Sequence, residues 1–130
     1  MTQAQLSDNQ LKAIHDGNIA VLDTFVNSDN LNDCYEVKNS SYGFLAISIK
    51  MKSLASLKYF VEKGADLEVV CTGKTPLMYS VKYGRLEMVK YLIGMGAKPD
   101  AKTLSGRTAL SYAKKYKQLE IEAYLLGLKN

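Results

Sequence analysis

The feature that most constrains this chain of 130 residues is an internal repeat with a period of about 33 residues. The letters GKTPL at residues 73–77 return as GRTAL at residues 106–110. At the other end of the unit, LKYF at 57–60 returns as VKYL at 89–92, and a weaker copy begins at Ala13. One such unit buries too little surface to fold alone. The repeat therefore predicts a solenoid in which neighbouring units stabilise one another.

The third copy is similar to the ankyrin repeat, whose pattern runs Gly-x-Thr-Pro-Leu-His-x-Ala and ends in Leu-Leu and Gly-Ala-Asp. It carries this pattern in register at Gly73, Thr75, Pro76, Leu77, Gly84, Val89, Leu92, Gly96 and Ala97. The resemblance extends from about Ser7 to Leu128. It implies an all-α fold, an ankyrin-repeat solenoid of four helix-turn-helix units. The chain would then be one domain, residues 1–130, with units at about 7–35, 36–68, 69–101 and 102–130.

The chain departs from the family pattern at positions that can be named. The histidine of the Thr-Pro-Leu-His box is Met78 in the third unit and Ser111 in the fourth. The second unit has GFLA at 43–46 in place of the box. The hydrogen bonds made by that histidine in the family cannot be assumed here.

Local chemistry supports the same architecture. Thr75 can cap a helix that starts at Pro76, because its hydroxyl accepts a hydrogen bond from a free amide and proline is tolerated at the first helical position. Residues 86–93 have apolar residues at helical spacing and are followed by glycines. Ser7 and Gln10 are predicted to form a capping box at the first helix.

Core and end positions follow from the register of the units. We expect the recurring apolar positions to be buried; they are Leu45, Leu57, Phe60, Leu77, Val89, Leu92, Leu110 and Leu125. In the end units, Gln10 and Glu122 stand at positions that are apolar in the other units. These exchanges predict polar capping repeats at both ends of the array.

Composition excludes several classes of protein. A hydrophobic fraction of 47% and a charged fraction of 23% are typical of a globular domain. We find no signal-peptide pattern and no apolar run long enough to span a membrane. The two cysteines, Cys34 and Cys71, are expected to be ordinary thiols in a reducing, cytoplasmic compartment. The glycosylation sequon at residues 39–41 is then a chance match.

Catalytic and cofactor sites are not predicted. His15 is the single histidine, and a lone imidazole without spaced partners is a weak candidate for catalysis or metal binding. The glycines at 94–96 and 73–75 lack the full phosphate-loop spacing. The sequence therefore predicts a protein that is not an enzyme and that has neither cofactor nor metal.

Charge is unevenly distributed along the chain. Residues 1–36 hold six acids and one base, a formal charge of −5, whereas residues 37–130 hold sixteen bases and seven acids, a formal charge of +9. The molecule should have an acidic end and a basic body.

The family resemblance implies that partners dock on a concave side, formed by finger-like loops and the exposed faces of the first helices. Lysine recurs in the outward slot of these helices, and tyrosine follows it in two units. The predicted binding residues are Tyr42, Lys50, Lys52, Lys74, Lys82, Tyr83, Arg107, Lys115, Tyr116 and Lys117. A second interpretation stays open, in which the lysines form a solvated face and the tyrosines merely pack on their stems.

Binding is thus the expected activity. The sequence predicts a monomeric protein that binds an acidic protein surface, either as a stoichiometric inhibitor of the immunity type or as an adaptor. The alternative partner is a polyanion, nucleic acid or anionic lipid, bound through the same lysines. The acids mixed among the bases of residues 37–130 disfavour nucleic acid.

Overall fold

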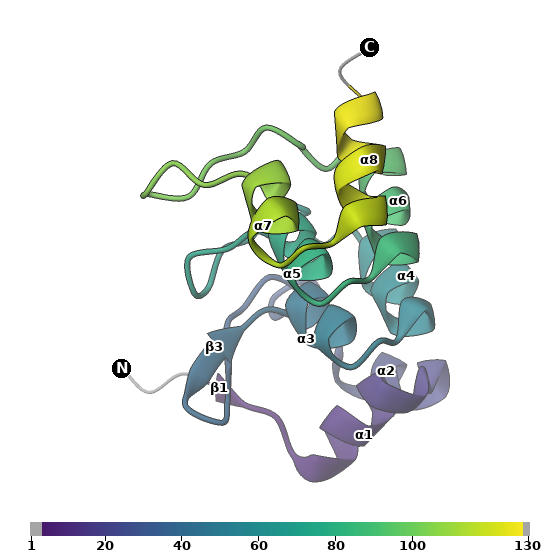
Figure 1. Ribbon diagram of the computed structural model, residues 1–130. Helices are drawn as coiled ribbons and strands as arrows, with labels where there is room; N and C mark the ends of the chain where they lie inside the picture. Colours follow the sequence, from purple (N-terminus) through teal and green to yellow (C-terminus); the bar gives the residue numbers. More distant parts are fainter. Residues whose placement is uncertain (1–3, 129–130) are drawn as a thin grey trace.

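Four pairs of antiparallel helices stack side by side in the computed structural model, which describes residues 4–128 (Figure 1). The pairs are α1 (Asp8–Asp16) with α2 (Ile19–Phe25), α3 (Phe44–Lys50) with α4 (Leu54–Glu62), α5 (Pro76–Lys82) with α6 (Leu86–Gly94), and α7 (Ala109–Lys115) with α8 (Leu119–Gly127). The first helices of successive pairs pack on one another, α3 on α5 and α5 on α7. Loops project beyond them on the side away from α4, α6 and α8.

A small sheet makes the fold mostly helical rather than all-α. Strands β1 (Ala4–Gln5), β2 (Tyr35–Val37) and β3 (Ser40–Tyr42) pair in the order β1-β2-β3, with β1 parallel and β3 antiparallel to β2. Lys38 and Asn39 form the hairpin turn with φ of 48° and 68°, the left-handed backbone that a two-residue turn of type I′ requires. The prediction missed these strands because the repeat pattern contains no signal for them.

Helix boundaries confirm the predicted caps. The Thr75 hydroxyl accepts a hydrogen bond of 3.2 Å from the Met78 amide, and α5 begins at Pro76. Ser7 and Gln10 form the expected capping box, with the Gln10 carboxamide oxygen 2.8 Å from the Ser7 amide. The predicted second helix of the third unit is α6, which extends one residue beyond the predicted range to Gly94.

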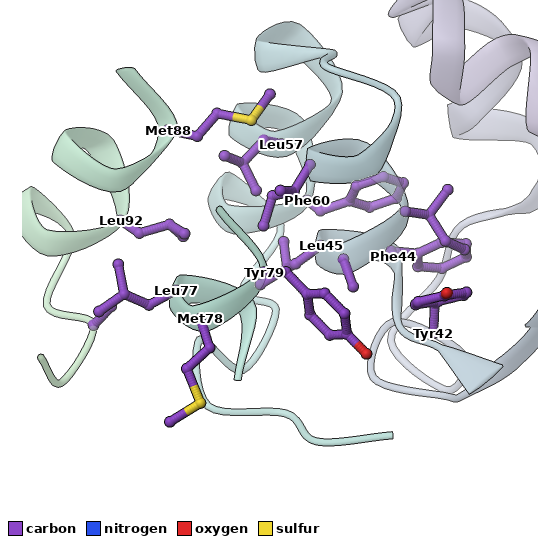
Figure 2. Close-up of a cluster of buried hydrophobic side chains, with 14 of the residues drawn as sticks. Tyr42, Phe44, Leu45, Leu57, Phe60, Leu77, Met78, Tyr79, Met88 and Leu92 are labelled. Carbon is purple, nitrogen blue, oxygen red and sulfur yellow. The ribbon is translucent and has the colours of Figure 1, made fainter. Parts of the chain in front are cut away.

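The core runs along the stack between the two layers of helices (Figure 2). Phe44 and Phe60 stack at a centroid distance of 4.5 Å, and Tyr35 stacks on the other side of Phe44 at 4.7 Å. Seven of the eight predicted core residues are buried. Leu110 is half-buried, because it lies in the last helix pair, beside an apolar groove of about 470 Å³ that Leu125 and Leu128 also line.

Arg85 connects the third helix pair to the second. Its guanidinium donates hydrogen bonds of 3.1 Å to the backbone carbonyls of Ile49 and Lys50. These carbonyls lie in the last turn of α3, where the regular helical donors run out. The Ile49 carbonyl also accepts a hydrogen bond of 3.0 Å from the Lys52 amide. Arg85 therefore fixes the end of α3 that carries Lys50.

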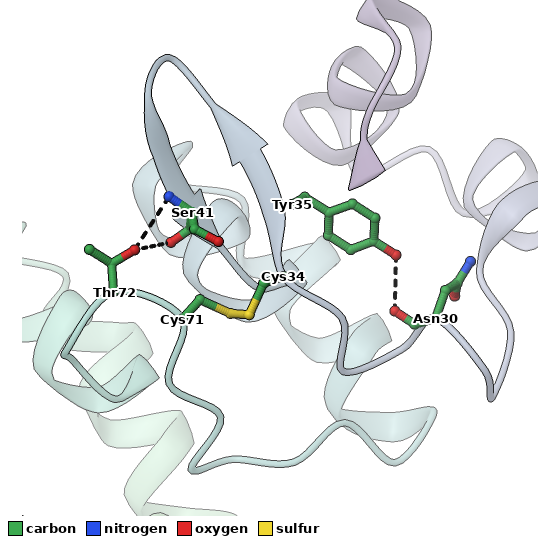
Figure 3. Close-up of a disulfide and its surroundings, with 6 residues drawn as sticks. All are labelled: Asn30, Cys34, Tyr35, Ser41, Cys71 and Thr72. Carbon is green, nitrogen blue, oxygen red and sulfur yellow. Dashed lines mark hydrogen bonds between the residues drawn. A yellow bond between two sulfur atoms is a disulfide. The ribbon is translucent and has the colours of Figure 1, made fainter. Parts of the chain in front are cut away.

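Cys34 and Cys71 form a disulfide, and the prediction of two free thiols was wrong (Figure 3). The two residues are 37 positions apart and lie in the loops that precede α3 and α5, the first helices of neighbouring pairs. Thr72 and Ser41 add hydrogen bonds beside the disulfide, one of 3.3 Å from the Ser41 amide to the Thr72 hydroxyl and one from that hydroxyl to the Ser41 carbonyl. The expectation of a reducing compartment rested on unpaired cysteines. It loses that support, because disulfides persist mainly in oxidising compartments.

Among the helices of residues 4–128, none has both the length and the apolar composition needed to cross a membrane.

Candidate functional site

In three consecutive helix pairs, the first helix ends in a lysine. Lys50, Lys82 and Lys115 are the last residues of α3, α5 and α7. A cation in the last turn of a helix interacts favourably with the partial negative charge of the helix end, so this position is locally stable. Because α3, α5 and α7 pack in sequence, the three ammonium groups lie at corresponding positions of adjacent units.

Five tyrosines line the same side of the stack: Tyr42, Tyr79, Tyr83, Tyr112 and Tyr116. Within α5 and α7, tyrosines four residues apart stack, with ring centroids 6.3 Å apart for Tyr79 and Tyr83 and 6.2 Å apart for Tyr112 and Tyr116. Tyr42 meets Tyr79 edge to face at 5.7 Å. Tyr79 and Tyr112 were not among the predicted binding residues, although each lies four residues before a tyrosine that was.

Cations lie over these rings. The Lys50 ammonium is 4.7 Å from the Tyr42 ring centroid and donates a 3.2 Å hydrogen bond to the Tyr42 hydroxyl. Lys82 lies between two units, 5.6 Å from the Tyr83 ring and 6.0 Å from the Tyr116 ring. Such contacts are worth about 0.5–1 kcal/mol each when exposed. They orient the lysines while leaving the positive charge available.

Two further cations contact the tyrosines from the loop side. The Lys74 ammonium lies 5.7 Å from the Tyr79 ring and 5.8 Å from the Tyr112 ring, and the Arg107 guanidinium lies 5.9 Å from the Tyr112 ring. The ladder face, as we call this surface, consists of Tyr42, Lys50, Lys74, Tyr79, Lys82, Tyr83, Arg107, Tyr112, Lys115 and Tyr116.

The tyrosine hydroxyls differ in acidity. Burial raises the pKa of Tyr42, but hydrogen bonds from Lys50 and Ser40 and the charges of Lys50 and Lys82 outweigh it, so the pKa lies below the usual 10.0. Burial, together with the neighbouring Tyr42, raises the pKa of Tyr79 to about 12. Tyr79 is therefore a neutral, packed ring, whereas the Tyr42 oxygen is the acceptor that holds Lys50.

Within residues 4–128, no carboxylate forms an ion pair with a cation of the ladder face. Residues 37–61, 69–86 and 101–119, which include α3, α5 and α7, contain no Asp or Glu. The ion pairs found among residues 4–128 are those of Lys12 and His15 with Asp16 and of Lys63 with Asp23. The cations of the ladder face thus face aromatic rings and solvent.

Lys52 and Lys117 lie in the turns between the two helices of their pairs, and neither is among the cations of residues 4–128 that lie over the tyrosine rings. Their backbones are left-handed, with φ of 60° and 56°, like Gly17 and Gly84 at the corresponding position of the other pairs. Lys52 borders a groove of about 310 Å³ that Leu54 and Leu86 also line. The structure therefore brings eight of the ten predicted binding residues together and separates these two.

Replacing Lys52 or Lys117 by glycine is expected to raise the free energy of unfolding by about 0.5–1 kcal/mol, because glycine adopts left-handed backbone without steric cost. Urea denaturation followed by circular dichroism measures the change. Lys58→Gly, in the middle of α4, is the control and should lose about 1 kcal/mol. A lower midpoint for both turn variants would contradict the expectation.

His15 lies in an exposed cluster with Lys12 and Asp16. Its Nδ1 lies 2.9 Å from an Asp16 carboxylate oxygen, and the Lys12 ammonium lies 2.6 Å from the other oxygen. The hydrogen bond from Lys12, followed by that from His15, lowers the pKa of Asp16. Within residues 4–128 no group of three or more His, Cys, Asp or Glu side chains is arranged to hold a metal ion.

A second set of tyrosines, Tyr59, Tyr91 and Tyr124, recurs at one position of α4, α6 and α8 and joins neighbouring units. Lys58 lies over the Tyr91 ring of the next unit at 5.7 Å, and Lys90 over the Tyr124 ring at 5.8 Å. The Tyr59 hydroxyl donates a 2.5 Å hydrogen bond to Asp23 of the preceding unit. Each contact joins neighbouring units.

Comparison with known proteins agrees with the stacked helix pairs. A family model described as ankyrin repeats (3 copies) matches residues 11–103 and 45–130. An ankyrin repeat protein of Fowlpox virus (strain NVSL) is 37% identical over 51 residues, 39% of this chain and 9% of that protein. The ankyrin repeat and KH domain-containing protein 1 of Homo sapiens is 44% identical over 45 residues, 35% of this chain and 2% of that protein. The matches thus span a small part of the length of these relatives. Because the family model covers most of the chain, the protein belongs to the ankyrin-repeat family, whose repeats are generally non-catalytic modules that bind other proteins.

Proposed function

We propose that the protein acts by binding another protein, docking an acidic surface of that partner on the ladder face. The observation that carries the proposal is the combination of five cations and five tyrosines on one side of the stack, with no carboxylate in the segments that supply them. Tyrosine and arginine are residue types that often dominate binding energy at interfaces. On the ladder face, Tyr83, Tyr116 and Arg107 are accessible to a partner, and the other three tyrosines are buried and support the cations. Unneutralised cations of one sign also raise the encounter rate with an acidic partner.

Charge reversal tests this proposal. The variant Lys50→Glu/Lys82→Glu/Lys115→Glu is expected to lose an acidic partner that the wild-type protein retains in affinity capture from a lysate of the source organism. The retained proteins are identified by mass spectrometry. Each of the three side chains lies at a helix end and contacts solvent, so the variant should keep its helical circular dichroism spectrum.

A matched control reverses three charges elsewhere. Lys58→Glu/Lys90→Glu/Lys98→Glu makes the same change in net charge on exposed lysines away from the ladder face. It should retain the partner. Equal capture of the partner by both triple variants and the wild type would overturn the proposal. Loss of the partner by both variants would show that net charge, and not the ladder face, determines binding.

The two candidate roles, inhibitor and adaptor, differ in their effect on the activity of the partner. An inhibitor of the immunity type abolishes the partner's activity at one molecule per partner, whereas an adaptor leaves that activity intact and retains a second protein. Titration of the captured partner with the purified chain separates the two, because inhibition then saturates at equimolar concentration.

A polyanion partner makes a distinct prediction, since stacked aromatic rings beside cations also suit single-stranded nucleic acid. Binding to nucleic acid weakens steeply with salt, with a slope that counts the phosphates contacted. We favour the protein partner, and a shallow salt dependence together with capture of protein would support it.

A further inference from the structure

One cleft on the loop side of the ladder face has the properties of an anchoring pocket. It lies between two neighbouring loops, has a volume of about 300 Å³, and is lined by Gly73, Lys74, Thr103, Leu104, Ser105, Arg107 and Tyr112. This volume is at the lower end of the roughly 300–1,000 Å³ typical of ligand pockets, so the cleft suits one or two side chains. We call it the finger cleft.

Both walls of the finger cleft are braced. On one side, Cys71 is joined to Cys34, and Thr72 bonds to Ser41, directly before Gly73 and Lys74. On the other side, the loop closes on itself. The Thr103 amide donates to the Arg107 carbonyl at 2.9 Å, and the Arg107 amide donates to the Thr103 hydroxyl at 3.1 Å. A ligand would therefore meet a cleft that is already formed.

Two cations converge on one ring at the base of this cleft. The Lys74 ammonium and the Arg107 guanidinium lie 5.8 and 5.9 Å from the centroid of Tyr112. Neither is among the ion pairs of residues 4–128. A guanidinium presents a planar fork that matches a carboxylate, and an ammonium adds a second charge. The pair is arranged to receive an anion that residues 4–128 do not supply.

Leu104 stands at the rim of the finger cleft with its side chain fully exposed, at 111% relative accessibility. An apolar side chain in this position gains from being covered, whereas the adjoining cations require a negative charge. A partner segment with an acidic residue next to an apolar one would cover Leu104 and neutralise the adjoining cations at the same time.

We propose that the finger cleft binds one aspartate or glutamate side chain of an extended partner segment, with its carboxylate between Lys74 and Arg107 and an adjoining apolar side chain on Leu104. This inference rests on the proposed protein-binding function and specifies the part of the partner that anchors it. The lysines at the ends of α3, α5 and α7 then contribute to approach and orientation, and the finger cleft supplies the specific contact.

The test uses a phage-displayed library of random linear peptides selected on the immobilised full-length protein. We expect the enriched peptides to contain Asp or Glu beside an aliphatic or aromatic residue. The dissociation constants of the synthesised peptides, measured by fluorescence polarisation, should increase about tenfold to a hundredfold with Arg107→Ala and with Lys74→Ala. Arg107→Lys keeps the charge but loses the fork and should fall between the wild type and Arg107→Ala.

Two controls separate the cleft from general charge. Lys102→Ala removes an exposed lysine close to the same loop and should change the dissociation constant less than twofold. In the background of Lys50→Glu/Lys82→Glu/Lys115→Glu, Arg107→Ala should still increase the dissociation constants of the peptides. Failure to enrich acidic peptides, or acidic peptides that bind Arg107→Ala and Lys74→Ala as well as wild type, would overturn the inference. In that case, the proposed function would still be supported if capture of the partner depends on Lys50, Lys82 and Lys115.

Discussion

Replacement of Phe60 by alanine is expected to lower the free energy of unfolding by about 3–5 kcal/mol, as large-to-small changes at buried aromatic positions do. Phe60 has no accessible surface, stacks face to face on Phe44 at 4.5 Å and meets the edge of Tyr59 at 5.3 Å. The cavity would lie in the second helix pair, within the stack, where neighbouring units on both sides limit collapse. Urea denaturation monitored by circular dichroism gives the change directly.

Tyr124→Ala is the matched control for Phe60→Ala. Tyr124 is a half-buried aromatic residue of the last helix pair, so its truncation should cost clearly less. Domains of this kind have total stabilities of about 5–15 kcal/mol, so Phe60→Ala should leave a marginally folded protein. A loss below about 1 kcal/mol for Phe60→Ala would mean that the buried aromatic stack does not stabilise the array as described.

Loss of the disulfide is expected to have an effect of similar size. The Cys34→Ser/Cys71→Ser variant should lose about 4 kcal/mol relative to the oxidised protein, because a cross-link between residues 37 apart restricts the unfolded chain by about that much in the loop-entropy account. Thermal unfolding of the oxidised wild type, the reduced wild type and the double variant measures the change.

Reduced wild type and the double variant should unfold alike, since both lack the bond. Thiol titration provides the complementary observation, because the oxidised protein should contain no reactive thiol, whereas the reduced protein should contain two. Two titratable thiols in protein purified without reductant would contradict the bond itself. Equal stability of the oxidised and reduced forms would instead show that the loops are held by their other contacts.

Much of the architecture could be predicted from the sequence because the repeat constrains it at many positions at once. The register of Thr75 and Pro76 located the start of α5, and the recurring apolar positions located the core. Leu110 is the exception, since its side chain borders the apolar groove beside α7 and α8 and is only partly covered.

Other features arise from contacts between units and leave little trace in a single unit. The disulfide and the β2–β3 hairpin both lie in loops, where the family pattern places few fixed residues. Tyr79 and Tyr112 were missed because they are nearly buried and resemble core residues in sequence. Their importance appears when Lys74 is found between them, and sequence spacing alone cannot place a side chain between two units.

The contacts that join the second and third helix pairs affect how the protein would bind a partner. Arg85 holds the end of α3 that carries Lys50, and the Cys34–Cys71 bond holds the loop that carries Lys74. Under the proposed docking mode, a partner would meet side chains whose backbone supports are already fixed, so association would lose little conformational entropy. Such preorganisation lets a modest contact area give tight binding.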